Sequence, residues 1–474
     1  MVFSSSIFLF AFLPATLAGY YLINPRFRNF FLMFVSIFFY AWGEPKFVFL
    51  MLASILANYV FALVIDRYRQ HKALAKAVLA VMVLCNVTFF FIFKYLNFTV
   101  TNLNSFFGLQ LPQTHIALPI GISFFTFQIM SYVFDVYRQQ GDVQKNPINV
   151  ALYVSLFPQL IAGPIVRYET VAREINCRHE NMQDFSKGVC RFIIGLAKKV
   201  IISNTVAVVA DHAFAYTDFS ALSVSMAWLG IICYTLQIYF DFSGYSDMAI
   251  GLGLMFGFHF LENFNYPYIS RSITEFWRRW HISLGTWFRD YVYFPMGGSR
   301  VKSKSRLIFN LFVVWALTGI WHGASWNFLA WGLFYFVLLA IEKLTGFPEK
   351  CSKTWVRNLY WVPTMLFVML GWVLFRAPDL SHAMNYMGSM FGLMSNPVTS
   401  VDISFFWQEY GFFILLGVLF SFPIVAALAK PVKAFLALNN MSKVLIPVLY
   451  VTLFFIAVTY VVNSTYNPFI YFNF

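Results

Sequence analysis

The sequence predicts an all-α, polytopic integral membrane protein, and its composition, its apolar runs and its loop charges support this class. Of 474 residues, 60% are hydrophobic and only 11% are charged, whereas soluble domains are about 45–50% apolar and about 25% charged. So few charges cannot cover a surface in water. This excludes an ordinary soluble enzyme, a disordered chain and a disulfide-stapled secreted domain. We expect one membrane domain over 1–474.

The apolar stretches place the expected helices along the chain. A spanning helix needs roughly 17–25 mostly apolar residues, and we expect about ten to twelve full crossings. Three short or interrupted stretches, 30–42, 149–165 and 307–322, are expected to be half-helices or re-entrant pieces, which are tolerated only inside protein. Interfacial helices are expected as well. The candidate spans are 3–22, 30–42, 47–65, 74–96, 116–136, 186–210, 223–242, 245–260, 307–322, 326–344, 359–375, 404–428 and 444–463.

Loop charge predicts the orientation in the membrane. Lys and Arg are absent from 97–115, 211–222 and 377–403, so these loops are expected outside. The basic loops between them are expected inside, and both termini are then extracytoplasmic. Arg26 and Arg28 follow the first apolar stretch and none precedes it, which indicates an uncleaved helix. The net charge of +13 is thus explained by cytoplasmic loops and membrane lipids, without a nucleic-acid partner.

The sequence carries no motif for a disulfide framework, a metal site or a bound cofactor. The five cysteines are dispersed without CxxC spacing, so neither a disulfide framework nor a metal site is expected. No P-loop, HExxH or serine elbow occurs, and we expect no bound cofactor.

The densest polar and aromatic cluster is 271–300, within a cytoplasmic-side segment at 266–306. Ser272 and Glu275 form a capping box, which predicts that a helix starts there. On that helix Trp277, His281, Leu284 and Phe288 would share one face. A basic helix with Trp and Phe equally suits an interfacial anchor, which would explain most of these residues. It does not readily explain His281, a titratable ring on the aromatic face.

A second cluster surrounds His322, which lies in an apolar run beside Trp321 and Gly323. An ionisable residue at membrane depth is costly and usually faces a pathway or cavity. Imidazole also suits proton transfer near neutral pH. Gly319 and Gly323 would leave room for a ligand or for a neighbouring helix. The alternative is a buried structural histidine satisfied by hydrogen bonds.

Two further segments combine polar residues with helix breaks. Asp241 and Asp247 end an apolar run, where they would orient a histidine or cap a broken helix, and the second reading is at least as well supported. The prolines of 157–164 suit a broken helix that lines a cavity.

Taken together, the motifs resemble the membrane-bound O-acyltransferase superfamily, in particular its bacterial polysaccharide-acetylating branch, typified by alginate O-acetyltransferases. The resemblance rests on PIGISFFTFQIMSYVFDVYR at 119–138, FPQLIAGPIVR at 157–167, IYFDFSGYSD at 238–247, the segment 275–298 and WHG at 321–323. It implies an all-helical body around a central tunnel, with His322 as the catalytic histidine and His281 at the second signature position. It also implies an extracytoplasmic partner of the SGNH-hydrolase type. The aromatic tail 469–474 is similar to this family's terminus.

The implied activity is transfer of acetyl from a cytoplasmic donor, expected to be acetyl-CoA, to an exported or cell-wall polysaccharide. His322 would be the general base and His281 would orient a group or share the proton; a covalent histidine adduct is the other route. The expected tunnel residues are Trp277, Trp280, Asp241, Asp247, Trp321, Gly323 and Asn327. A basic mouth would attract the donor phosphates through Arg271, Arg278, Arg279, Arg289 and Arg300.

Other functions fit the same sequence. The acceptor is open between an alginate-like exopolysaccharide, cellulose and peptidoglycan. A neighbouring branch transfers D-alanyl groups to teichoic acid. A transporter or lipid flippase shares broken helices and intramembrane carboxylates, and a membrane scaffold would need neither histidine.

Overall fold

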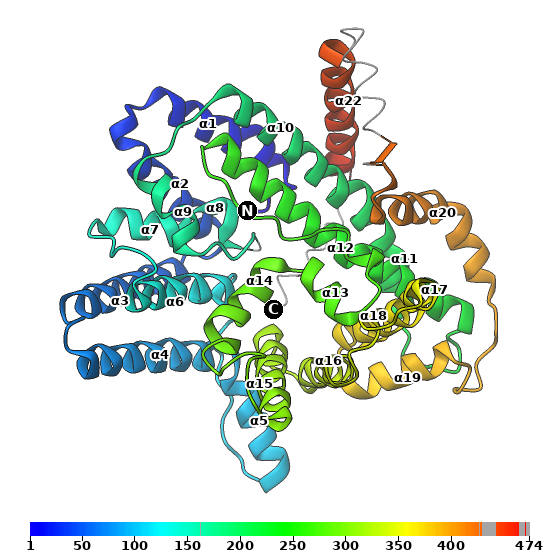
Figure 1. Cartoon of the computed structure of the whole chain (residues 1–474). Coiled ribbons are helices and arrows are strands. Elements are labelled where there is room, and N and C mark those ends of the chain that lie inside the picture. Colours follow the sequence, from blue (N-terminus) through cyan, green and yellow to red (C-terminus); the bar gives the residue numbers. More distant parts are fainter. Residues whose placement is uncertain (162, 426, 429–441, 464–469, 471–474) are drawn as a thin grey trace. The chain divides into compact units, whose positions relative to one another are not determined.

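A computed structural model describes residues 1–161, 163–425, 427–428, 442–463 and 470, and the regular elements in this part of the chain are helices joined by loops (Figure 1). No strand occurs in these residues, so the predicted all-α class is confirmed. The helices form two compact units. Unit 1 contains Met1–Phe192 and Ser246–Leu261, and unit 2 contains Ile193–Tyr245 and Glu262–Ile470. The expected aromatic tail lies outside the described residues except for Ile470.

Unit 1 is built mainly from the first third of the chain. Within it α3 packs against both α4 and α6, and α2 packs against α7 (Figure 1). α10 begins in this unit and α12 ends in it. Its elements are η1 (Phe8–Phe12), α1 (Leu13–Leu22), η2 (Pro25–Phe27), α2 (Arg28–Gly43), α3 (Phe47–Arg67), α4 (Lys72–Lys94), α5 (Leu96–Phe107), α6 (Ile122–Arg138), α7 (Pro147–Ser155), α8 (Phe157–Leu160), α9 (Tyr168–Asn176) and α10 (Met182–Ala197).

The predicted broken helix is confirmed in unit 1. α7 ends at Ser155, α8 is a single turn, and Leu156 between them is not helical (φ −51°, ψ 111°). Pro158, in the first turn of α8, has no backbone N–H to donate, and its ring would clash with the Val154 carbonyl if α7 continued, so one helix cannot run through both pieces. Gly121 starts α6 with φ 76°, and a Cβ there would lie 3.0 Å from the Leu160 carbonyl oxygen. A glycine is therefore required where α6 meets α8.

Unit 2 contains the two sequence clusters with histidines. Its core includes the antiparallel pair α15 and α16, and α16 also packs against α13 and α18 (Figure 1). Its elements are η3 (Lys198–Ser203), α11 (Asn204–Phe214), α12 (Val224–Met255), η4 (Pro267–Ile269), α13 (Ile273–Arg279), α14 (Ile282–Phe288), η5 (Arg289–Tyr293), α15 (Lys304–His322), α16 (Trp326–Thr345), α17 (Thr354–Leu359), α18 (Trp361–Arg376), α19 (Leu380–Met390), α20 (Val401–Ser421) and α22 (Ser442–Asn463).

Small residues set the distance between α15 and α16. A Cβ on Gly319 would lie 2.6 Å from the Phe328 carbonyl oxygen, and one on Gly332 would lie 2.5 Å from the Trp315 carbonyl oxygen. Contacts this short exclude any side chain, as is typical of closely packed membrane helices. The space at Gly319 is therefore taken by a neighbouring helix, which was one of its two predicted uses.

Within the described residues, eight helices are long and apolar enough to cross a membrane: α3, α4, α10 through α11, α12, α16, α17 through α18, α20 and α22. α2 and α6 are shorter, with 16 and 17 residues. The expected spans 223–242 and 245–260 are one continuous helix, α12, of 32 residues. The sequence prediction of a helix break at 241–247 was therefore wrong.

Partnered carboxylates explain why α12 does not break. In unit 2, Asp241 is 1% exposed and lies 2.5 Å from the Lys199 Nζ; it also accepts a hydrogen bond from the Ile470 backbone N–H at 3.0 Å. In unit 1, Asp247 accepts from Arg191 Nη2 at 2.7 Å and from Nε at 3.0 Å. Because each carboxylate has an external partner, neither needs the backbone amides of a broken helix.

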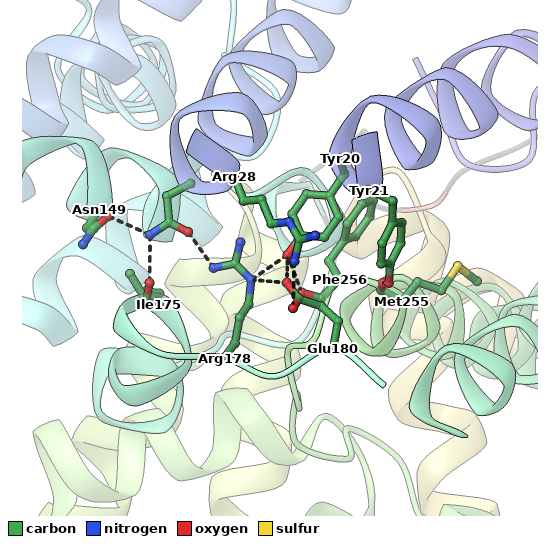
Figure 2. A network of polar contacts seen from close by, with 10 residues as sticks. Tyr20, Tyr21, Arg28, Asn149, Ile175, Arg178, Glu180, Met255 and Phe256 are labelled. Carbon is green, nitrogen blue, oxygen red and sulfur yellow. Dashed lines mark hydrogen bonds and ion pairs between the residues drawn. The ribbon is translucent and has the colours of Figure 1, made fainter. Parts of the chain in front are cut away.

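A network of polar contacts joins several helix ends in unit 1 (Figure 2). Glu180 lies 2.9 Å from Arg28 and 3.5 Å from Arg178, and it accepts a short hydrogen bond from the Tyr20 hydroxyl. Arg178 also donates to Tyr20 at 2.8 Å and to Asn29 at 2.5 Å. The network thus ties α1, α2 and the segment after α9 together.

Candidate active site

His322 is the last residue of α15, and aromatic rings enclose it. It is 4% exposed. The centroid of its ring lies 4.9 Å from that of Trp321, 4.9 Å from that of Trp331 and 5.1 Å from that of Phe375, each at a steep interplanar angle. The predicted location of His322 at a helix end inside an apolar region is thus what the structure shows.

His281 lies at a sharp backbone turn between α13 and α14. Its φ of 45° and ψ of 53° are left-handed, which is uncommon for a residue other than glycine. The single helix expected through 272–288 is therefore wrong, and Trp277, His281, Leu284 and Phe288 do not share a helical face. The capping box itself is partly confirmed, since the Glu275 N–H donates to Ser272 Oγ at 2.9 Å, while the Glu275 carboxylate accepts from the Arg271 N–H.

Asn263 stabilises this turn. Its backbone carbonyl accepts from the Ile282 N–H at 3.0 Å, and its side-chain oxygen accepts from the Ser283 N–H at 3.1 Å. The same oxygen lies 3.2 Å from His281 Nδ1. Burial lowers the pKa of His281 to about 3. Its ring is therefore neutral at physiological pH and acts through hydrogen bonds, not through a charge.

Trp321 brings the two histidines into one site. Its ring centroid lies 6.2 Å from that of His281 and 4.9 Å from that of His322. Phe242 of α12 covers His281 from another direction, with a centroid distance of 4.6 Å. Two histidines that are distant in sequence thus line the same aromatic region of unit 2.

Three buried hydrogen-bond donors of the ring cluster that contacts His322 through Trp331 have no acceptor among the described residues. They are the indole N–H groups of Trp277 and Trp331 and the hydroxyl of Tyr335. These rings are mutual neighbours, with centroid distances of 4.9 Å from Trp277 to Tyr335 and 5.3 Å from Trp331 to Tyr335. An unsatisfied buried donor costs about 1–3 kcal/mol. Three together indicate a place where a substrate or water accepts hydrogen bonds.

The other predicted tunnel residues have different surroundings. Trp280 packs on Trp372 at 4.8 Å. Asn327 donates to the carbonyls of Leu374 and Ala377 at 3.2 and 2.8 Å, so its amide brackets the end of α18. At Gly323 a Cβ would lie 2.3 Å from the ring of Phe328. Asp241 is paired with Lys199, and Asp247 belongs to unit 1 with Arg191.

Most of the predicted basic mouth is paired with carboxylates. Arg278 lies 3.7 Å from Glu349, Arg279 lies 2.9 Å from Glu275, and Arg289 lies 2.8 Å from Asp290. Arg271 and Arg300 are exposed. The five arginines thus lie on one segment, and the carboxylate partners of three of them reduce the net positive charge of that segment. No group of three His, Cys, Asp or Glu side chains in the described ranges could hold a metal ion.

Sequence reasoning did not single out several residues of this site. Trp331, Tyr335 and Glu342 lie on α16, and Phe375 lies on α18. The spacing of Trp331, Tyr335 and Glu342 places them on one helical face, a pattern that could have identified them. Asn263 is visible in the sequence only as one of several polar residues after an apolar run.

Comparison with known proteins identifies the family. Residues 34–389 match the family model described as MBOAT, membrane-bound O-acyltransferase family. A probable alginate O-acetylase of Pseudomonas aeruginosa is 46% identical over 395 residues, covering 82% of this chain and 75% of the relative. A peptidoglycan O-acetyltransferase of Helicobacter pylori is 37% identical over 427 residues, covering 83% and 80%. A teichoic acid D-alanyltransferase of Bacillus subtilis is 30% identical over 284 residues, covering 56% and 70%. The chain belongs to the membrane-bound O-acyltransferase family and is an integral membrane acyltransferase.

Proposed function

We propose that this chain transfers acetyl groups from cytoplasmic acetyl-CoA across the inner membrane, for O-acetylation of an exported or cell-wall polysaccharide. The observation that carries the proposal is the contact of His322 with Trp331, which forms with Trp277 and Tyr335 a cluster of rings whose buried donors have no acceptor among the described residues. Support also comes from the relatives, which include alginate and peptidoglycan O-acetylating proteins. Alginate-like exopolysaccharide, cellulose and peptidoglycan are the candidate acceptors.

In the proposed reaction, His322 accepts the proton of an acceptor hydroxyl while the oxygen attacks the thioester carbonyl carbon. Negative charge then develops on the carbonyl oxygen, and buried donors stabilise it. The carbon–sulfur bond breaks and the protonated His322 returns the proton to the CoA thiolate. The products are an acetyl ester and CoA. His281, neutral and held by Asn263, orients the reacting group.

The donor is proposed to approach at the segment that carries Arg271, Arg278, Arg279, Arg289 and Arg300. The carboxylate partners of three of these arginines reduce the local charge, but the segment keeps a positive surplus that attracts the phosphates of CoA. An extracytoplasmic partner of the SGNH-hydrolase type would receive the acetyl group and complete transfer to the polysaccharide.

The decisive experiment compares purified His322→Ala with a matched control, His71→Ala, which removes an exposed loop histidine. Release of CoA thiol from acetyl-CoA and incorporation of labelled acetyl into acceptor are measured. Loss of the base should lower the rate by about 10²–10⁴-fold, and the control should retain it. A wild-type rate in His322→Ala would overturn the role of His322.

The proposed orientation is testable with native cysteines. Cys177 is exposed beside basic residues that we place inside, and Cys351 lies between Lys350 and Lys353. A membrane-impermeant maleimide should label both in inverted inner-membrane vesicles and neither in intact spheroplasts. Labelling in spheroplasts would contradict the orientation and, with it, extracytoplasmic termini.

A further inference from the structure

Glu342 is a buried acid on α16 whose carboxylate accepts hydrogen bonds from the start of α13. It is 7% exposed. Its Oε1 accepts from the Ile273 N–H at 2.7 Å, and its Oε2 accepts from the Thr274 N–H at 2.9 Å and from Thr274 Oγ1 at 2.7 Å. These two amides belong to the first turn of α13, where helical amides have no partner within their own helix.

The same face of α16 contacts the active site at two other levels. Tyr335 lies against Trp277 with a centroid distance of 4.9 Å, and Trp331 lies against His322 at 4.9 Å. Trp331, Tyr335 and Glu342 follow each other at helical spacing. One helix therefore supports His322 directly and also holds the start of the segment that leads to His281.

The backbone between the first turn of α13, which Glu342 holds, and His281 is short and mostly helical. α13 runs from Ile273 to Arg279, and His281 follows two residues later in its left-handed turn. Asn263 holds the far side of that turn. A shift of α13 at its first turn would therefore be transmitted to the His281 ring, because a helix of seven residues moves as a rigid piece.

We propose that Glu342 is a positioning residue for His281: its carboxylate fixes the first turn of α13 against α16 and so sets the place of the His281 ring relative to His322. A catalytic role for His281 at this position rests on the proposed function, whereas the structural role of Glu342 in positioning it does not. The carboxylate is suited to this role because it accepts three hydrogen bonds at once and stabilises the positive end of the helix.

The test uses full-length protein with a graded set of substitutions. Thr274→Val removes one of the three hydrogen bonds, Glu342→Gln removes the charge and one acceptor oxygen, and Glu342→Ala removes all three. Glu409→Gln is the matched control, because Glu409 is an exposed acid on α20 of the same unit. Each variant is checked for monodisperse folding before measurement.

The first measurement is the rate of diethylpyrocarbonate modification at His281 and at His322, resolved by peptide mass spectrometry. It needs no enzymatic activity. Glu342→Ala should raise the rate at His281 roughly tenfold and leave His322 protected, with the other variants between it and wild type. An unchanged His281 rate, or an equal increase at both histidines, would overturn the positioning role.

The second measurement is acetyl-CoA kinetics of the same variants. A displaced His281 should lower kcat by up to about 100-fold. KM for acetyl-CoA should rise as well, because α13 also carries Arg278 and Arg279, two of the arginines proposed to attract the donor, but the fall in kcat is the result specific to His281. A loss confined to KM would contradict the role. If wild type itself shows no transfer, the proposed function fails, and the modification rates still decide whether Glu342 positions His281.

Discussion

The polar network of unit 1 and the histidine site of unit 2 use buried polar groups in opposite ways. In the network, Glu180 lies between Arg28 and Arg178 and also accepts from Tyr20, so each charge has an opposite partner (Figure 2). In the site, rings surround His322, and the donors of Trp277, Trp331 and Tyr335 have no acceptor within the described chain.

This difference distinguishes groups that stabilise the fold from groups that await a ligand. A network in which each charge has an opposite partner gains stability, because the desolvation of each charge is offset by that partner, even though Arg28 Nε has no acceptor among the described residues. An unsatisfied donor lowers stability and is retained where another molecule completes its hydrogen bond. Four predictions test this distinction, in order of decreasing effect.

The largest effect is expected at the buried pair of Asp241 and Lys199, which we place with the stabilising groups despite its predicted tunnel position. Asp241→Asn removes the negative charge 2.5 Å from Lys199 Nζ. Breaking a buried pair costs about 3–5 kcal/mol, so the detergent-solubilised protein should melt far below wild type. The double variant Lys199→Met/Asp241→Leu should recover much of the loss. A single variant as stable as wild type would contradict this assignment.

The second effect is expected in the unit 1 network. Arg178→Met removes hydrogen bonds to Tyr20 and Asn29 and an ion pair with Glu180. Hydrogen bonds to charged groups contribute about 1.5–3 kcal/mol, and the free energy of unfolding should fall by that order. Acetyl transfer per folded molecule should stay within a factor of two. Arg26→Met, at an exposed arginine nearby in sequence, is the control; a selective loss of activity in Arg178→Met would break the comparison.

The third prediction contrasts two buried tyrosines of unit 2. Tyr335→Phe removes a hydroxyl that has no acceptor among the described residues, whereas Tyr386→Phe removes one that donates to the Ala227 carbonyl at 2.8 Å. We expect Tyr335→Phe to lower the transfer rate about tenfold and to leave thermal stability equal or higher. Tyr386→Phe should lose about 1 kcal/mol of stability and no activity. The reverse pattern would show that the unsatisfied donors are unrelated to function.

The smallest effect concerns an exposed histidine of unit 1. Burial lowers the pKa of His259, but contacts with Glu174 at 2.7 Å and Asp184 at 3.3 Å outweigh it and raise the pKa overall. The stabilisation of the folded protein by His259 is then complete below the pKa that His259 has in the unfolded chain. It is lost as the pH rises through the higher pKa that His259 has in the folded protein. Since His259 is half exposed, it amounts to roughly 0.2–1 kcal/mol.

His259→Gln should therefore lower the melting temperature at pH 5.5 and have no effect at pH 9. His115→Gln provides a control at another loop histidine. An equal fall in melting temperature at pH 9 and at pH 5.5 would show that His259 stabilises the fold through packing and not through its charge.

Sequence reasoning was most successful where the signal is local. Long apolar runs located α3, α4, α16 and α22 within a few residues, because the cost of exposing backbone and polar groups to lipid acts on each segment separately. His322 was found for the same reason, as an ionisable residue in an apolar run is visible without any knowledge of its neighbours.

The failures share a different cause. The break at His281 depends on Asn263, which packs from another segment. The continuity of α12 depends on Lys199 and Arg191, which supply partners for Asp241 and Asp247. Neither helix periodicity nor capping residues carry information about such long-range contacts, and the local break signals were therefore misleading.

The sequence by itself determined that this chain is a helical membrane protein with two histidines in aromatic, apolar surroundings, because hydrophobicity and residue identity are properties of single segments. Only the tertiary structure decided which polar groups are saturated and which are not. Asp241 pairs with Lys199, and Asn327 donates to the carbonyls at the end of α18. Tyr335 and Trp331, by contrast, have donors without an acceptor in the described part of the chain, and Trp331 contacts His322. Hydrogen bonds and ion pairs join residues that are remote along the chain, so their pairing is fixed only when the helices pack.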